Sequence, residues 1–158
     1  MVASELLLAD GTGVELRLLQ PDDDPALADF QGRLPEESHA LASGGDAPDR
    51  MALVATTGQA IVGVARYDRL PGGDQAELAL VVEDRFQGRG LGTALLQRLA
   101  AFAHDRGVAR LVAVTSPEHQ RVRQVVRRAG FETASVYDGR TVKVAFSTAP
   151  VPAWNQLR

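Results

Sequence analysis

The chain has 158 residues, of which 45% are hydrophobic and 23% are charged, and its formal net charge is −3. This length and apolar content suit one domain with its own core, and the mildly acidic balance gives no overall attraction to nucleic acid. The absence of cysteine excludes disulfides and thiol chemistry, and the three histidines lack the spacing of a zinc site, so we expect no metal. The sequence contains neither a secretory leader nor an apolar run of about 20 residues, from which we expect a cytoplasmic protein that does not enter a membrane.

The first third of the sequence predicts a strand, two short helices and a loop. Residues 14–18 (VELRL) alternate apolar and polar side chains, which is the period of a half-buried strand. The three aspartates at 22–24 suit the cap of a helix from about residue 25 to 32, and a cation site is the alternative role for them. Pro35 opens a second short helix, PEESHALA. Residues 42–50 (ASGGDAPDR) are typical of a flexible loop, which we expect to border a substrate site.

The remaining two thirds predict a meander of strands that contains one β–α–β unit. The predicted segments are strands at 51–57, 60–70 and 75–82, a helix at 91–106, a strand at 109–114, a helix at about 118–128, and a hairpin around Asp138 and Gly139. The domain core therefore extends from about residue 14 to 146, and residues 147–158 form a tail. Trp154 in this tail is a candidate contact of a homodimer, although the oligomeric state is not readable from the sequence.

A glycine-rich turn, RFQGRGLG at residues 85–92, joins the third of these strands to the following helix. Gly88, Gly90 and Gly92 stand at alternate positions and leave backbone amides uncovered where the helix begins. These donors and the positive end of the helix dipole form a seat for a diphosphate without a lysine. The alternative is that the glycines only allow a tight turn, but three glycines and two arginines in eight residues exceed that need.

Two other phosphate-binding patterns fit the turn poorly. The GxxxxGK[ST] loop of the NTPases requires a lysine, which is absent here. The dinucleotide-binding GxGxxG pattern requires a third glycine where Thr93 stands and a carboxylate after the next strand, which ends at Val114 and Thr115 without one. An NTPase loop is therefore excluded and a dinucleotide-binding turn is disfavoured, while a generic nucleotide binder remains an alternative.

The run VVEDRFQGRGLGTALL resembles the acetyl-CoA-binding motif of the GNAT family of N-acetyltransferases. Gln87, Gly90 and Gly92 match its pattern of Gln or Arg, two residues, Gly, one residue, then Gly or Ala. The order of elements between residues 14 and 146 is also similar to that fold. The resemblance implies a single α/β (α+β) domain over residues 1–158, with a mixed, mostly antiparallel central sheet flanked by about four helices. It also implies acetyl-CoA as co-substrate and an N-acetyltransferase that acts on a primary amine.

The same resemblance assigns the cofactor contacts. It implies that the strand before the turn parts from its neighbour, that pantetheine pairs with the exposed backbone there, and that the amides of the turn hold the diphosphate while two arginines add charge. Both arginines have an alternative role as solvated turn residues. The expected cofactor-binding residues are Leu80, Val81, Val82, Arg85, Gln87, Gly88, Arg89, Gly90, Leu91, Gly92, Thr93 and His119.

Transfer of an acetyl group to an amine requires the amine to lose its proton, and a lysine of pKa ~10.4 is less than about 0.1% neutral at pH 7. Along residues 76–82 the alternation puts one wholly apolar face opposite a face that carries Glu77. Glu77 is therefore our candidate general base, and bacterial protein lysine acetyltransferases of the family resemble the chain in having glutamate at this position. A solvated glutamate on a strand face is the alternative. The amide of Val81 or Val82 is the expected donor to the thioester oxygen.

The helix HQRVRQVVRRAGFE resembles a later motif of the family, in which asparagine, six residues and then tyrosine usually occur. His119 and Val126 occupy these two positions, so the general acid that the tyrosine supplies in many relatives is missing. Tyr67 and Tyr137 are candidate substitutes, with packing as their alternative role. His119 either contacts the cofactor or lies on the surface.

The acceptor is the least readable part of the reaction. The segment from Leu16 to Leu41 resembles the start of bacterial protein lysine acetyltransferases, but the loop after it departs from them. Protein lysine, a polyamine, an aminoglycoside and an amino acid all stay open as acceptors. A catalytically silent, CoA-binding regulatory module is the alternative to an enzyme.

Overall fold

The structure is a computed structural model that describes residues 3–34, 49–115 and 121–149. Its elements, in chain order, are β1 (Ser4–Leu7), β2 (Gly13–Leu18), η1 (Pro21–Asp23), α1 (Asp24–Gly32), β3 (Arg50–Thr57), β4 (Ala60–Arg69), β5 (Gln75–Val82), η3 (Asp84–Phe86), α2 (Leu91–Asp105), β6 (Arg110–Thr115), α3 (Arg121–Arg128), β7 (Thr133–Tyr137) and β8 (Val142–Ser147). The described ranges thus contain three α-helices of the four expected. The predicted short helix after Pro35 lies outside them, as do most of the loop at 42–50 and Trp154.

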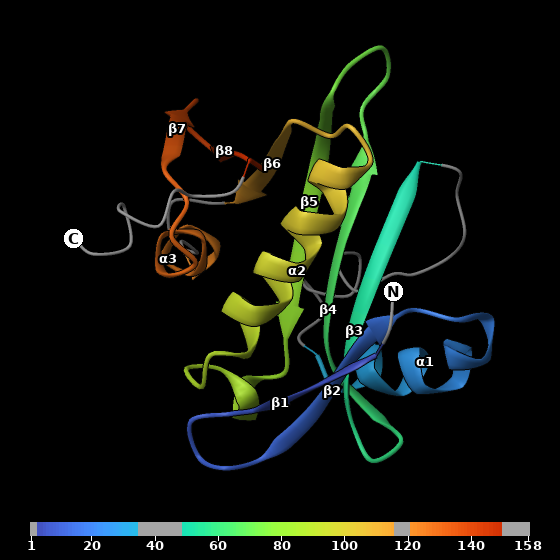
Figure 1. Ribbon diagram of the computed structural model, residues 1–158. Helices are drawn as coiled ribbons and strands as arrows, with labels where there is room; N and C mark the ends of the chain where they lie inside the picture. The colour runs from blue at the N-terminus through green and yellow to red at the C-terminus, as the bar shows by residue number, and fades with distance from the viewer. Residues whose placement is uncertain (1–2, 35–48, 116–120, 150–158) are drawn as a thin grey trace.

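One eight-stranded sheet, in the order β1-β2-β3-β4-β5-β6-β8-β7, forms the centre of the fold (Figure 1). All neighbouring strands are antiparallel except β5 and β6, which are parallel because α2 connects them. The predicted meander, β–α–β unit and terminal hairpin are confirmed. Strand β1 was not predicted from the sequence, because its four residues end within a run of three leucines that has no period of two.

The two faces of the sheet are covered by different helices. Leu53, Ala65 and Leu78 belong to the cluster that also contains the buried side of α2, whereas their neighbours in sequence, such as Val54 and Val64, pack against α1. On the buried side of α2, Leu91, Leu95 and Leu99 are fully buried and Phe102 is partly buried, as their helical spacing predicts. Figure 1 shows α2 lying along β4 and β5, with its N-terminus at the end of β5 that leads into the glycine turn.

Gly63 allows α2 to approach the sheet closely at this end. A Cβ atom on Gly63 would lie 3.0 Å from Cδ1 of the buried Leu95, which is tighter than ordinary van der Waals contact. Gly63 is also the register partner of Val82, the last residue of β5. The close packing therefore sets the position of the helix relative to the strand that precedes it.

The acidic triplet joins β2 to the start of α1. The carboxylate of Asp23 accepts two hydrogen bonds of 2.7 Å from the guanidinium of Arg17 and one of 2.7 Å from the amide of Gln20. The cap therefore acts on the short turn η1, one turn earlier than the predicted cap of α1. The carboxylate of Asp23 is paired with the guanidinium of Arg17. The hydrogen bonds from Arg17 hold the pKa of Asp23 below its ordinary value.

We expect Asp23→Asn to lower the free energy of unfolding by about 2 kcal/mol at pH 7, because it removes a charge-assisted pair at a buried site. A lowered folded-state pKa means that this stabilisation is present above the unfolded pKa of about 3.9 and is lost as the pH falls through the folded-state value. Urea unfolding at pH 7 and pH 3 measures this, with the exposed Asp22→Asn as control. An equal loss at both pH values would contradict the assignment.

Candidate active site

A fork in the sheet opens between β5 and β6. The two strands pair only over Gln75–Glu77 and Arg110–Val112. Beyond this point β5 continues along β4 as far as Val82, and β6 continues along β8 as far as Thr115. Because each strand is held by its outer neighbour, the facing edges diverge, and Glu77 and Val112 form the apex of the fork.

The direction of the backbone groups on β5 follows from the ladder with β4. The amide of Glu83 donates to the carbonyl of Val62 at 3.0 Å, and the carbonyl of Gln75 accepts from the amide of Leu70 at 2.9 Å. Hydrogen-bonding groups alternate along an antiparallel strand, so every second residue from Gln75 to Glu83 faces β4 and the residues between them face the fork.

Two of the three predicted pantetheine-pairing residues therefore direct their peptide groups into the fork. These are Leu80 and Val82. The peptide groups of Val81 face β4, and its side chain is buried against α1. The carbonyl of Val82 already accepts a hydrogen bond of 2.9 Å from Nε2 of Gln87. With respect to the residues that the structure describes, the amide and carbonyl of Leu80 and the amide of Val82 stay open.

The glycine turn presents a row of open amides at the start of α2. Gly88 and Gly90 have φ angles of 76° and 91°, in the left-handed region that favours glycine. Within the described part of the chain, the amides of residues 88–93 donate no hydrogen bond. The amide of Gln87 differs, because it donates to the carbonyl of Asp84 at 3.1 Å. The predicted seat is therefore one residue shorter than expected, and the side chain of Gln87 instead ties the turn to the end of β5.

Both arginines of the turn have carboxylate partners. Nε of Arg85 lies 2.9 Å from Oε1 of Glu83, and its guanidinium lies 5.1 Å from the centre of the Phe86 ring. Nη1 of Arg89 pairs with Oδ2 of Asp10 in the turn between β1 and β2. Sequence reasoning missed Asp10, because a contact between distant turns leaves no periodic signal in a sequence. It also missed Glu83, two residues before Arg85, because the roles predicted for Arg85 were a cofactor contact or a solvated turn residue.

Glu77 is exposed at the apex of the fork, on the face opposite α2. It borders a hollow of about 340 Å³ together with Arg110, Val112 and Val114 of β6 and residues of β7 and β8. Burial lowers the pKa of the neighbouring Arg66, which feels the negative charge of Glu77 as well as that of Asp68. The carboxylate therefore stands where the strands part, with a surface of mixed charge and apolar side chains beside it.

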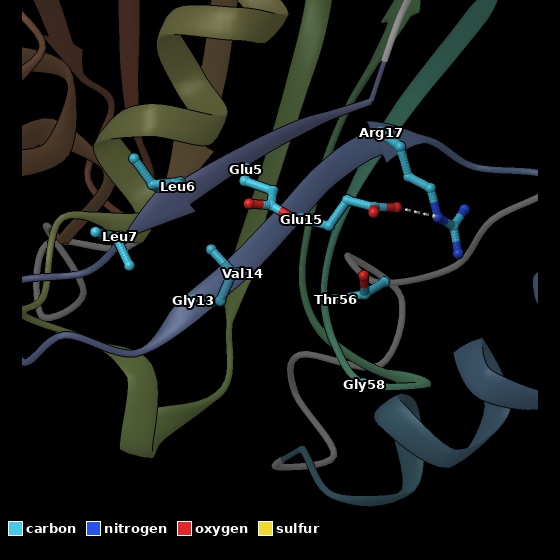
Figure 2. Close-up of a pocket in the computed structure, with 9 residues that line it drawn as sticks. All are labelled: Glu5, Leu6, Leu7, Gly13, Val14, Glu15, Arg17, Thr56 and Gly58. Carbon is cyan, nitrogen blue, oxygen red and sulfur yellow. Dashed lines mark ion pairs between the residues drawn. The ribbon is translucent and has the colours of Figure 1, made fainter.

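A second hollow, of about 570 Å³, lies far from the fork on the β1–β2 hairpin (Figure 2). Glu5 and Glu15 lie next to each other there on paired strands, and Glu15 pairs with Arg17 at 3.6 Å. Two adjacent carboxylates repel a diphosphate, so this hollow does not suit an acidic cofactor.

A protein-family model described as "Acetyltransferase (GNAT) family" matches residues 17–131. The chain belongs to the GNAT family. The GNAT domain of PAT from S. lividans is similar over 92% of this chain and 96% of its own, with 28% identity and a TM-score of 0.79. A mutant of the cAMP-binding acyltransferase from Mycobacterium smegmatis matches at 25% identity and a TM-score of 0.71 over 94% of this chain, which spans about half of that protein (48%).

The ribosomal-protein-S18-alanine N-acetyltransferase from Escherichia coli has the same fold, with 21% identity and a TM-score of 0.62 over 89% of this chain and 97% of its own. GNAT acetyltransferases use an acyl-CoA as co-substrate, so this chain is an acyl-CoA-dependent N-acyltransferase by family. The fork and the open amides fit such a molecule, because they offer unpaired peptide groups to an amide-containing arm and N–H donors to a diphosphate.

The GNAT tyrosine position holds Val126, which is fully buried in the core. Of the candidate substitutes, Tyr67 is buried on the α2 face, where burial raises its pKa, and the hydroxyl of Tyr137 donates to the carbonyl of Gly139 at 3.1 Å. Strand alternation places both on the face opposite Glu77. His119 lies outside the described residues.

The described residues contain no group of three His, Cys, Asp or Glu side chains suited to a metal ion. Among the described helices, even α2, with 15 residues, falls short of what a membrane crossing needs.

We expect Gly90→Ala to weaken the binding of CoA by at least about tenfold, because a side chain disfavours the left-handed backbone that aims the amides. Gly107→Ala is the matched control, since Gly107 follows the other end of α2 with a φ of 82° and open space around it. Both variants should lose similar stability, about 1 kcal/mol, whereas only the first should lose affinity in calorimetric titrations. Equal loss of affinity in both would contradict a role of the turn in binding.

Proposed function

We propose that this GNAT protein transfers the acetyl group of acetyl-CoA to a primary amine, a lysine side chain of a protein, by direct attack in a ternary complex with Glu77 as general base. The observation that carries this proposal is the position of Glu77 at the apex of the fork, on the same strand whose open peptide groups suit the donor. The likeness to the GNAT domain of PAT supports a bacterial acetyltransferase of the same branch.

The donor lies along the fork in this proposal. The carbonyl of Leu80 and the amide of Val82 pair with the pantetheine arm, and the amides of Gly88 to Thr93 hold the diphosphate at the positive end of the α2 dipole. Arg89 adds charge beside them. The order along β5 then places the thioester towards the apex, because the diphosphate occupies the opposite end of the strand.

Glu77 accepts the proton of the attacking amine, directly or through a water molecule, and passes it to solvent because its side chain is exposed. The amide of Leu80, which points into the fork and lies nearer the apex than Val82, donates to the thioester oxygen as negative charge develops there. Of the two predicted donors, Val81 has its amide turned towards β4, and Val82 lies at the diphosphate end of the strand. Protonation of the departing thiolate does not require the usual tyrosine, because a thiol of pKa near 8.5 is a good leaving group.

The hollow beside Glu77 suits the acceptor. Val112 and Val114 offer apolar surface to the methylene groups of a lysine, and the carboxylate of Glu77 attracts its ammonium group. Arg110 and Lys143 at the rim would repel a polyamine or an aminoglycoside, which carry several positive charges. A lysine among acidic neighbours on a protein surface fits this charge pattern better.

We expect Glu77→Gln to lower kcat by about 100-fold or more, because the variant keeps the shape of the side chain but cannot accept a proton. The affinity for CoA should change less than about twofold, since Glu77 lies away from the open amides. Stopped-time assays with acetyl-CoA and lysine-containing peptides measure kcat, and calorimetric titration measures the affinity for CoA. Glu132→Gln, another exposed glutamate, is the control.

Other results would favour other functions. CoA binding without turnover across a panel of amines would indicate a silent regulatory module, an alternative that the buried Val126 favours. Stronger thermal protection by ATP or NAD than by CoA would indicate a different nucleotide binder. Wild-type turnover that Glu77→Gln leaves intact would refute the assignment of the base.

A further inference from the structure

The turn of the N-terminal hairpin docks on the glycine turn. The amide of Ala9 donates to the carbonyl of Arg89 at 3.3 Å, and the carboxylate of Asp10 accepts a hydrogen bond from Nη1 of Arg89, 79 residues away in sequence. Figure 1 shows the β1–β2 connection beside the segment that enters α2. The family match begins at residue 17, so Ala9 and Asp10 lie in a part of the chain that precedes the matched region.

The carboxylate of Asp10 is itself held in place. Its Oδ1 atom accepts the amide of Thr12 at 3.0 Å, which leaves Oδ2 for Arg89. The hydrogen bonds from Thr12, and then the charge of Arg89, keep the pKa of Asp10 below its ordinary value. Asp10 is therefore an ionised and oriented acceptor at neutral pH.

Arg89 is restrained from several sides but retains unused donors. Gly88 and Gly90 flank it, its carbonyl is bound by Ala9, and its guanidinium lies 5.9 Å from the centre of the Phe86 ring. A guanidinium has five N–H donors, and within the described residues only Nη1 has an acceptor. The pair with Asp10 thus restrains the guanidinium while Nε and Nη2 stay available for phosphate oxygens.

We propose that Asp10 is a positioning residue for the diphosphate of the acyl-CoA, acting through Arg89. This inference rests on the proposed function, because it requires the glycine turn to hold that diphosphate. Asp10 does not touch the cofactor. It orders a long, rotamer-rich side chain before binding, so that less entropy is lost when the phosphates arrive.

The test compares Asp10→Ala with Asp10→Asn. Asp10→Ala should raise KM for acetyl-CoA about threefold to fivefold, in keeping with an exposed pair, and should leave kcat within about twofold. Asp10→Asn should recover most of the loss, because an amide oxygen still accepts from Arg89. Neither change should affect kcat/KM for S-acetylpantetheine, which lacks the diphosphate, and Asp10→Ala should have no further effect in an Arg89→Gln background.

Asp138→Ala is the matched control, since Asp138 accepts from Thr141 in the exposed β7–β8 turn in the same local manner, away from the glycine turn. Tighter binding of acetyl-CoA by Asp10→Ala would overturn the proposal and indicate that Asp10 competes with the phosphates. Equal losses with acetyl-CoA and S-acetylpantetheine, or no loss at all, would also overturn it. If the wild type binds no CoA, the proposed function fails and this inference fails with it.

Discussion

The arrangement of the site depends on the early end of pairing between β5 and β6. Two adjacent parallel strands would normally continue their ladder, yet here each is held by an antiparallel neighbour on its outer side after only three residue pairs. A buried peptide group without a partner is costly, so such an opening is tolerated where water or a ligand reaches it. The fork therefore supplies two functions at once. It leaves the backbone of Leu80 open, and it places the carboxylate of Glu77 at the apex, where we propose that the acetyl transfer occurs.

The glycine turn extends this geometry to the end of β5. The hydrogen bond from the Gln87 side chain to the Val82 carbonyl closes the strand, and the two left-handed glycines redirect the chain so that the next amides point outward. Packing of Leu95 over Gly63 then holds α2 against the sheet. The same few contacts thus link the position of the pantetheine arm to that of the diphosphate, and the hairpin turn at Asp10 restrains the charged side chain beside them.

The parts of this architecture with strong local signals were predictable from the sequence. Alternation in β2 and β5, the leucine spacing of α2 and the turn glycines indicated the elements, and the spacing of Gln87, Gly90 and Gly92 indicated the family. The fork itself has no local signal, since the residues from Leu78 to Val82 read like any buried strand, and the direction of each peptide group depends on register. For the same reason the sequence could not distinguish Val81 from its neighbours, nor show that Arg89 meets Asp10 and that Arg85 meets Glu83.

The central claim is that the amides at the start of α2 hold the diphosphate of an acyl-CoA. The most direct measurement is a titration of the ¹⁵N-labelled chain with CoA, followed by NMR at each backbone amide. The account predicts that the signals of Gly88 to Thr93 move most and become protected from hydrogen exchange, together with those of Leu80 and Val82. Binding of CoA that leaves these signals unchanged, and moves those around Glu5 and Glu15 instead, would contradict it.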